Sequence, residues 1–176
     1  MAFPDEIITE SELGSSVRTK VNRGLSTQGL ACAASGLAGS TSIPDGAWTK
    51  VSPTVFLPGN TGASMTTGTI TVPEAADGAW IVTFGMQWKN DQGGLTKHRR
   101  KLRLMNGIYP LAEIPEVLFD PAMGDLTENS AHNGVASIKL PGLGGRVVHM
   151  EAWQNSGIAV NIVTSSIRMV RLGDAQ

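Results

Sequence analysis

The segment Gly78–Lys89 places the strongest limit on how this chain can fold. It reads GAWIVTFGMQWK, and every second residue in it is large and apolar. Successive side chains of a β-strand point to opposite sides, so this period of two gathers the large residues on one face, whereas a helix would scatter them. The residues of that face are Trp80, Val82, Phe84, Met86 and Trp88. The segment is therefore predicted to be a central strand of an antiparallel sheet, with this face in the core.

The chain from residue 41 onward shows a repeated strand-and-turn pattern. Short apolar stretches recur about every 8–12 residues, with Gly, Pro, Asn and Asp between them and no helical crossover. Most of these stretches have one apolar face, as strands do when two sheets pack face to face. The pattern predicts an all-β sandwich or barrel of about 8–10 antiparallel strands.

Three local features refine this prediction. Asn106-Gly107 is a dipeptide typical of tight hairpin turns. Pro110 and Pro115 are expected to cut the following strand short, because proline cannot donate to a β-ladder. Near the C-terminus the alternation slips between Met169 and Val170, which predicts a bulge there.

Residues 1–40 differ from the rest and are predicted to form an N-terminal anchor, with a head domain over 41–176. Ser15 is a good N-cap, and an apolar stripe at helical spacing runs from there to Gly24. A helix of about two turns is not stable alone, so it must dock on its own domain, a neighbouring copy or a larger assembly. A Gly-, Ser- and Ala-rich arm follows it. The expected contact residues are Leu13, Val17, Arg18, Lys20 and Val21.

Charge and cysteine content argue against several classes of partner and of fold. The net charge of −1 gives no global reason to expect nucleic acid or an acidic membrane as a partner. No apolar run approaches the roughly 20 residues of a membrane span, and the N-terminus does not resemble a secretion signal. The single cysteine, Cys32, excludes an internal disulfide and is expected to be a buried, inert thiol. We expect a soluble protein made in a reducing cytoplasm.

The sequence contains no recognisable catalytic or metal-binding constellation. His98, His132 and His149 lack metal-ligand spacing, and no Gly-X-Ser-X-Gly motif occurs. We therefore expect no enzymatic activity and no cofactor. Calcium is left open, because carboxylates in one long predicted loop could bind it. These carboxylates are Glu113, Glu116, Asp120, Asp125 and Glu128.

The run Lys97–Arg103 is the densest charge in the chain. As a strand it puts Lys97, Arg99, Lys101 and Arg103 on one face, and His98, Arg100 and Leu102 on the other. The basic face is interpreted either as a solvated outer surface or as a contact with an acidic neighbour in an assembly. Nucleic acid is disfavoured, because no interleaved aromatic residues offer stacking platforms.

The order of motifs from Trp48 onward resembles the trimeric jelly-roll head shared by complement-type collagenous proteins and the tumour necrosis factor group. Trp48–Val51 is similar to the opening strand of that family. Ile70–Pro73 followed by Gly78–Val82 is similar to its signature, with tryptophan at position 80 where the family usually has tyrosine. Val148–Gly157 is similar to a later strand and turn. The resemblance implies a jelly-roll fold and a homotrimer around a threefold axis, although the collagen-like stalk and secretion signal of animal members are missing.

A second resemblance concerns the N-terminus. Ile8–Leu13 and Val17–Asn22 are similar to attachment segments of tailed-bacteriophage virion proteins. A jelly-roll head behind such a segment implies a phage structural protein, made in the host cytoplasm and placed on the virion surface. Apolar residues on the second faces of strands would then need cover from other copies. The predicted oligomer-interface residues are Ile81, Val147, Trp153 and Val163.

Together these features predict a non-enzymatic virion protein. The first hypothesis is a homotrimeric surface knob, as a capsid decoration or short head fibre that binds other virion proteins of the capsid or tail. The alternative is a tail-tip protein that binds a host receptor or cell-surface glycan through its loops. Neither nucleic acid nor a membrane is expected as a partner.

Overall fold

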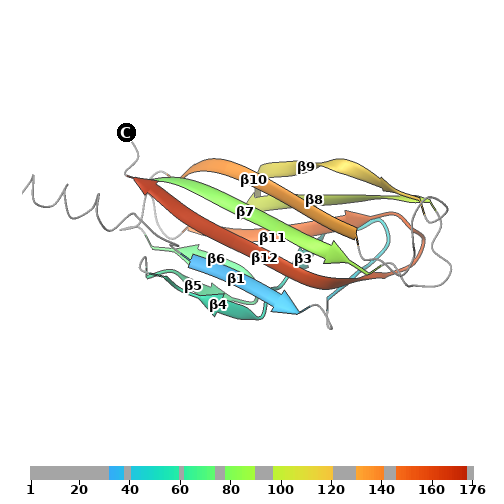
Figure 1. Ribbon diagram of the computed structural model, residues 1–176, viewed down its shortest axis with the longest axis horizontal. Coiled ribbons are helices and arrows are strands. Elements are labelled where there is room, and N and C mark those ends of the chain that lie inside the picture. Colours follow the sequence, from blue (N-terminus) through green and yellow to red (C-terminus); the bar gives the residue numbers. More distant parts are fainter. Residues whose placement is uncertain are drawn as a thin grey trace, which may run out of the picture.

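Two antiparallel β-sheets stack face to face in the part of the chain that the structure describes (Figure 1). The computed structural model describes residues 32–37, 41–59, 62–73, 78–89, 97–120, 130–140 and 146–173. Within these ranges, no helix has the length and apolarity needed to cross a membrane. The predicted all-β fold is confirmed, whereas the predicted N-terminal helix lies outside the described residues.

The first sheet has the strand order β10-β7-β12-β1-β4, and β2 pairs with β12 beside this path. Its strands are β1 (Cys32–Leu37), β2 (Ser42–Ile43), β4 (Val55–Leu57), β7 (Gly78–Trp88), β10 (Ser130–Leu140) and β12 (Val160–Gly173). In the centre, β7 pairs with β10 on one side and with β12 on the other. The segment that dominates the sequence pattern is therefore a central strand, as predicted.

The second sheet has the strand order β5-β6-β11-β8-β9, and β3 pairs with β11. Its strands are β3 (Thr49–Val51), β5 (Ser64–Thr66), β6 (Thr69–Val72), β8 (His98–Asn106), β9 (Tyr109–Phe119) and β11 (Arg146–Gln154). From β7 onward the chain crosses between the sheets at β8, β10, β11 and β12. These crossings give the jelly-roll arrangement of the sandwich.

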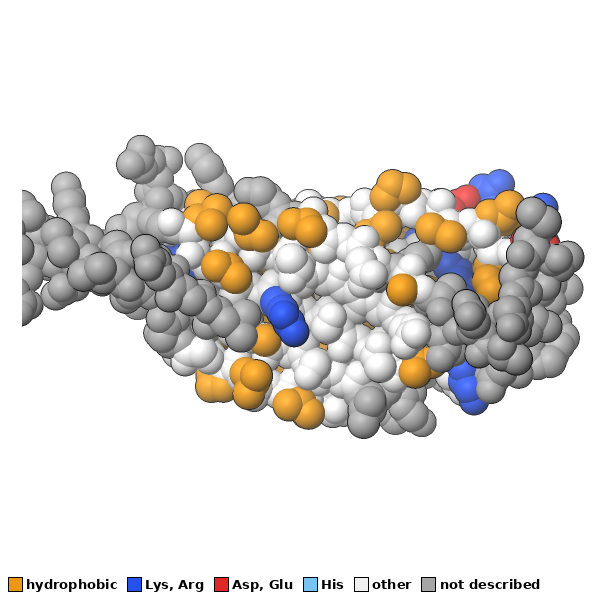
Figure 2. Space-filling view, in the orientation of Figure 1, with side chains coloured by type: hydrophobic (Ala, Val, Ile, Leu, Met, Phe, Trp, Pro, Cys, Tyr) orange, Lys and Arg blue, Asp and Glu red, His pale blue; other side chains and the backbone are white. Residues whose placement is uncertain are grey.

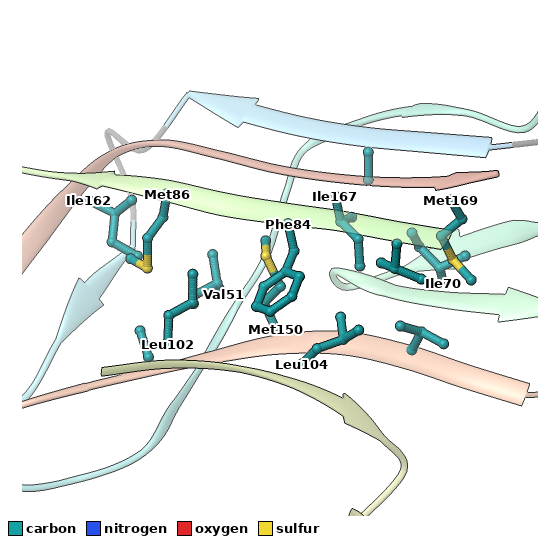
Figure 3. Packing of buried hydrophobic residues seen from close by; sticks show 14 of the residues in the cluster. Val51, Ile70, Phe84, Met86, Leu102, Leu104, Met150, Ile162, Ile167 and Met169 are labelled. Carbon is teal, nitrogen blue, oxygen red and sulfur yellow. The ribbon is translucent and has the colours of Figure 1, made fainter. Parts of the chain in front are cut away.

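The core lies between the sheets and is built from alternate residues of the long strands. Trp80, Val82 and Trp88 are 0% exposed, and Phe84 and Met86 are 3% exposed, so the predicted inner face of β7 is confirmed. In Figure 3, side chains from β7 and β12 point toward those from β8 and β11 and interdigitate with them. Burial of each large apolar side chain contributes about 1.5–3 kcal/mol, so this layer is the main source of stability.

The strand after the Asn106-Gly107 turn continues through both of its prolines, so the prediction of a short strand is wrong. The turn itself is confirmed: Gly107 has φ 58° and its N–H donates to the Val147 carbonyl at 3.0 Å. Strand β9 then runs from Tyr109 to Phe119. It tolerates Pro110 and Pro115 because it is the edge strand of its sheet, where one row of backbone groups needs no partner.

The bulge predicted between Met169 and Val170 is also misplaced. Ile167 and Met169 are both buried, so the alternation of β12 is intact at that point. Register shifts occur instead between Ile162 and Thr164 and between Arg171 and Gly173. The apparent slip in the sequence arises because apolar residues occupy both faces of the strand near its end.

Part of the predicted arm belongs to the head. Residues 32–37 form β1, which pairs with β12 on one side and with β4 on the other. Cys32 and Ala34 are buried, and their small side chains let this strand lie close over the core. The sheet therefore begins before the boundary expected near Thr41, because small residues pack in a sheet without a strong apolar signature.

Candidate functional site

The two outer faces of the sandwich differ sharply in charge. We call the outer face of the first sheet the neutral face, because Arg168 is the one charged residue among its outward side chains that the structure describes. The other outward residues of this face are Ala33, Ser35, Val55, Leu57, Ala79, Ile81, Thr83, Gly85, Gln87, Ala131, Asn133, Val135, Thr164, Ser166 and Val170. In Figure 2 this face is mostly white, with orange side chains toward its margins.

Apolar side chains lie toward both edges of the neutral face. Val55 and Leu57 on the edge strand β4 are 55% and 57% exposed, and Val135 on the opposite edge strand β10 is 71% exposed. Ile81 and Val170 are cross-strand neighbours between them and are half-buried. Large exposed apolar side chains at both margins of a sheet whose described outward side chains include one charge are typical of a surface that another protein covers.

The middle of the neutral face is hollow. Two adjoining depressions of about 410 Å³ and about 240 Å³ share Asn133 and Ser166 in their linings. These two residues are the cross-strand partners of Gly85, on β10 and on β12 respectively. Because glycine has no side chain, the sheet surface between its two polar neighbours is low. Thr83 and Arg168, which pair with each other one step along the strands, complete the wall.

The outer face of the second sheet carries a network of ion pairs, and we call it the ion-paired face. Arg103 donates to Glu151 Oε2 from Nε at 2.9 Å and from Nη2 at 2.6 Å. His149 Nε2 lies 3.2 Å from the other carboxylate oxygen. Burial raises the pKa of Glu151, but the hydrogen bonds and charges of Arg103 and His149 outweigh it, so the pKa lies below its ordinary value.

The remaining outward-facing cations of the basic run, Lys97, Arg99 and Lys101, are paired with carboxylates of β9 and the residue after it. Glu116 binds Lys101 at 3.1 Å and Arg99 at 2.5 Å, and Lys97 lies 3.1 Å from Asp120. The hydrogen bond from Lys101, aided by Arg99, lowers the pKa of Glu116. The basic face of the run is therefore neutralised within the chain, which favours the interpretation as an outer surface rather than a contact with an acidic neighbour.

Two half-buried tryptophans lie on the ion-paired face beneath cations. The Arg103 guanidinium carbon is 3.9 Å from the Trp48 ring centre, and Lys101 Nζ is 5.1 Å from the Trp153 ring centre. Cation–π contacts of this kind contribute roughly 0.5–1 kcal/mol at exposed sites. The rings are thereby held by residues of their own chain.

A buried cation lies at one end of the sandwich. Arg100 is 1% exposed, donates from Nε to His98 Nε2 at 2.9 Å, and has its guanidinium carbon 4.1 Å from the Phe119 ring centre. The Trp88 ring lies on it at 5.1 Å. Loss of hydration lowers the pKa of Arg100 to about 10, so it stays charged at neutral pH. The sequence placed Arg100 correctly on the inner face of β8, but nothing in the run indicated the aromatic cage.

The predicted oligomer-interface residues do not come together. Ile81 and Val163 belong to the first sheet, with Val163 at a register shift, whereas Val147 and Trp153 lie on the ion-paired face across the sandwich. No single flat contact could use all four. The predicted anchor residues Leu13, Val17, Arg18, Lys20 and Val21 lie outside the described residues.

No cluster of three or more potential metal ligands occurs among the described residues. His98 and His149 lie on opposite sides of the second sheet, and Asp125 and Glu128 of the suggested calcium loop are outside the described part.

Cys32 is buried, and loss of hydration raises its pKa to about 11, so the thiol stays protonated and unreactive. The hollow around Gly85 was missed from the sequence, although an isolated glycine inside a strong strand was a visible signal.

These sheets and their crossings define a jelly-roll fold, as the order of motifs predicted. No protein-family model and no characterised protein matches the chain by sequence. Among solved structures, PRD1 vertex protein P5 has a TM-score of 0.54 and 18% identity, over 81% of this chain and 99% of that one. The globular domain of zebrafish complement 1qA has a TM-score of 0.52 and 14% identity, over 81% and 98%. At these identities the likeness shows the fold alone.

Proposed function

We propose that this chain is a non-enzymatic structural protein of a bacteriophage virion, and that it forms a homotrimeric knob on the particle surface through its neutral face. The single observation that carries the proposal is the contrast between the two outer faces. One face satisfies its charges within the chain, whereas the other presents apolar margins and an almost uncharged centre. A face of the second kind is stabilised by being covered.

Self-association through the neutral face fits the physical requirements of such a contact. Apart from Arg168, its described side chains are uncharged, so few of them would lose strong hydration on burial. Its edge strands carry Val55, Leu57 and Val135, which supply apolar area where a neighbouring copy would approach. A repeated contact between different surfaces of identical subunits closes into a ring when the rotation permits, and three copies are what the family resemblance implies.

The virion assignment rests on two independent likenesses. The fold is similar to a protein whose name describes a vertex protein, and the N-terminal phrase resembles phage attachment segments. A predicted anchor N-terminal to β1 (Cys32–Leu37), with the head directly behind it, favours a capsid decoration or a short head fibre. The alternative, a tail-tip protein that binds a receptor or glycan, depends on loops that mostly lie outside the described residues and stays a prediction.

Two measurements test the proposal. Light scattering on the purified full chain is expected to give about three times the protomer mass of 18.5 kDa, and a stable 18.5 kDa species would overturn the trimer. Mass spectrometry of purified particles from an infection that expresses this chain is expected to find it in stoichiometric amounts. Its absence from those particles would overturn the virion role, even if the trimer formed.

A further inference from the structure

Four polar side chains converge on the central hollow of the neutral face without bonding to one another. They are Thr83 on β7, Asn133 on β10, and Ser166 and Arg168 on β12. Within the described part of the chain, none of these side chains makes a hydrogen bond or an ion pair with protein. On the opposite face, by contrast, Arg99, Lys101 and Arg103 each contact a carboxylate. Arg168 is thus an exposed cation whose counter-charge is not supplied by any described residue.

The chemistry of the lining is that of a donor set for an anion. A guanidinium offers several N–H donors in a fixed plane, an asparagine amide offers two more, and each hydroxyl offers one. The residues that line the two depressions include no aspartate or glutamate. A site with one fixed positive charge, several neutral donors and no acid favours an oxyanion over a cation or an apolar ligand.

The floor of the smaller depression, which adjoins the larger depression that Arg168 lines, explains how such a group could approach. Gly85 occupies an outward position in the middle of β7, between Asn133 and Ser166. Glycine inside a strand weakens it, and it commonly marks a place where a ligand or another backbone comes close. A larger residue at this position would fill the space between the two donors.

We infer that the hollow over Gly85 is an oxyanion-binding site, in which Arg168 pairs with a phosphate or sulfate group and Asn133, Thr83 and Ser166 donate hydrogen bonds to it. This inference goes beyond the proposed function, because the site is complete within one protomer. It also has a consequence for association. If another copy covers the neutral face, Arg168 loses water, and a bound oxyanion supplies the counter-charge that a buried cation requires.

The test measures thermal unfolding of the full chain in sodium phosphate and in sodium chloride at equal ionic strength. Phosphate is expected to raise the unfolding midpoint in a saturable manner, by on the order of 5 °C at concentrations far above the dissociation constant. Arg168→Gln is expected to weaken phosphate binding about 10- to 100-fold, because it removes a charged hydrogen bond. Asn133→Ala is expected to weaken it by a smaller factor.

Arg99→Gln is the matched control, since it removes an exposed arginine from the ion-paired face and should leave phosphate binding unchanged. Equal stabilisation of the wild type and Arg168→Gln by phosphate would overturn the site, as would equal effects of phosphate and chloride. The solution mass of every variant is recorded in parallel. Loss of binding at unchanged mass supports the site independently of the trimer, and a monomer that still binds phosphate supports the site while overturning the trimer.

A second ligand distinguishes the source of the oxyanion. If the neutral face is open to solvent, glucose 6-phosphate is expected to bind as inorganic phosphate does. That result supports the site with a sugar-borne phosphate as a ligand it admits, and it contradicts cover of the face by another copy. Binding of inorganic phosphate alone identifies a trapped ion beneath a neighbouring copy. Binding of neither contradicts the inference.

Discussion

The two outer faces of this sandwich cover the same core, yet their exposed side chains differ in charge and in pairing. On the ion-paired face, Arg103 and Glu151 bond across neighbouring strands, and Glu116 serves both Arg99 and Lys101. On the neutral face, small and apolar residues leave a low surface, and Arg168 is the one cation among its described outward side chains. The difference teaches that the ion-paired face satisfies its charges with described residues of its own chain, whereas the described residues of the neutral face supply no counter-charge to Arg168.

The largest effect is expected from a charge at the margin of the neutral face. Val55→Glu should dissociate the proposed trimer, because Val55 lies outside the depression that Arg168 lines, and burial of an unpaired carboxylate at the contact costs roughly 3–5 kcal/mol, about a 100-fold weakening or more. Sedimentation velocity measures the change in mass. Val147→Glu on the ion-paired face is the matched control and should leave the mass unchanged. Dissociation by Val147→Glu alone would move the interface to the other sheet, and dissociation by both variants would make the ion-paired face the second surface of the contact.

The next effect concerns the edge at which the two sheets meet. A Cβ on Gly134 of β10 would lie 2.8 Å from Ile114 Cγ1 and 3.0 Å from Phe84 Cζ. Gly134→Ala should therefore force these side chains to shift and lower the free energy of unfolding by about 1–3 kcal/mol. Chemical denaturation measures it, with Ala131→Ser on the exposed side of the same strand as a control. An unchanged midpoint in Gly134→Ala would mean that the side chains of Ile114 and Phe84 have room to move away from a Cβ at position 134.

A smaller effect is expected at the centre of the ion-paired face. Glu151→Gln should lower the free energy of unfolding by about 1–2 kcal/mol at pH 7, since it removes charged hydrogen bonds from a partly buried site. The pKa of Glu151 is lowered in the folded state, so its contribution is complete above the ordinary value of 4.5 and disappears as the pH falls through the folded-state pKa. Denaturation at pH 7 and pH 3 should therefore show a smaller acid loss for the variant. Parallel losses in both proteins would argue against this linkage.

The smallest effect is expected at the exposed end of the same network. Glu116→Gln removes the partner of Lys101 and Arg99, but these groups are largely in water, where ion pairs contribute little. Its unfolding midpoint should differ only slightly from that of the wild type at low salt, and the difference should vanish in about 1 M salt. A change larger than that of Glu151→Gln would reverse the ranking of buried and exposed pairs on this face.

Much of the fold could be predicted from residue alternation, and the failures have a common cause. The inner face of β7 was assigned residue by residue, because the strand is long and its large residues fall at a strict period of two. The length of β9 was predicted wrongly, because the effect of Pro110 and Pro115 depends on whether the strand lies at an edge of its sheet. The order of strands in the sheet decides this. The strand β1 was missed because Cys32–Leu37 contains small residues whose burial depends on neighbours far away in the sequence.

The residues of the candidate site could also be predicted only in part from the sequence. The four interface residues were chosen because they were apolar on second faces, but a strand pattern does not say which second faces belong to the same sheet. The pairing of the basic run with Glu116 and Glu151 could not be predicted from the sequence for the same reason, since these partners come from β9 and β11. Cross-strand neighbours are fixed only by register.

The sequence by itself determined that this chain is an antiparallel β-sandwich with its large apolar residues inside. The reason is that period-two alternation is local and indicates which side of each strand faces the core. Only the tertiary structure decided that one outer face neutralises its own charges and that the other leaves Arg168 beside an open hollow. That decision depends on which strands become neighbours, and distant segments meet only when the sheets assemble.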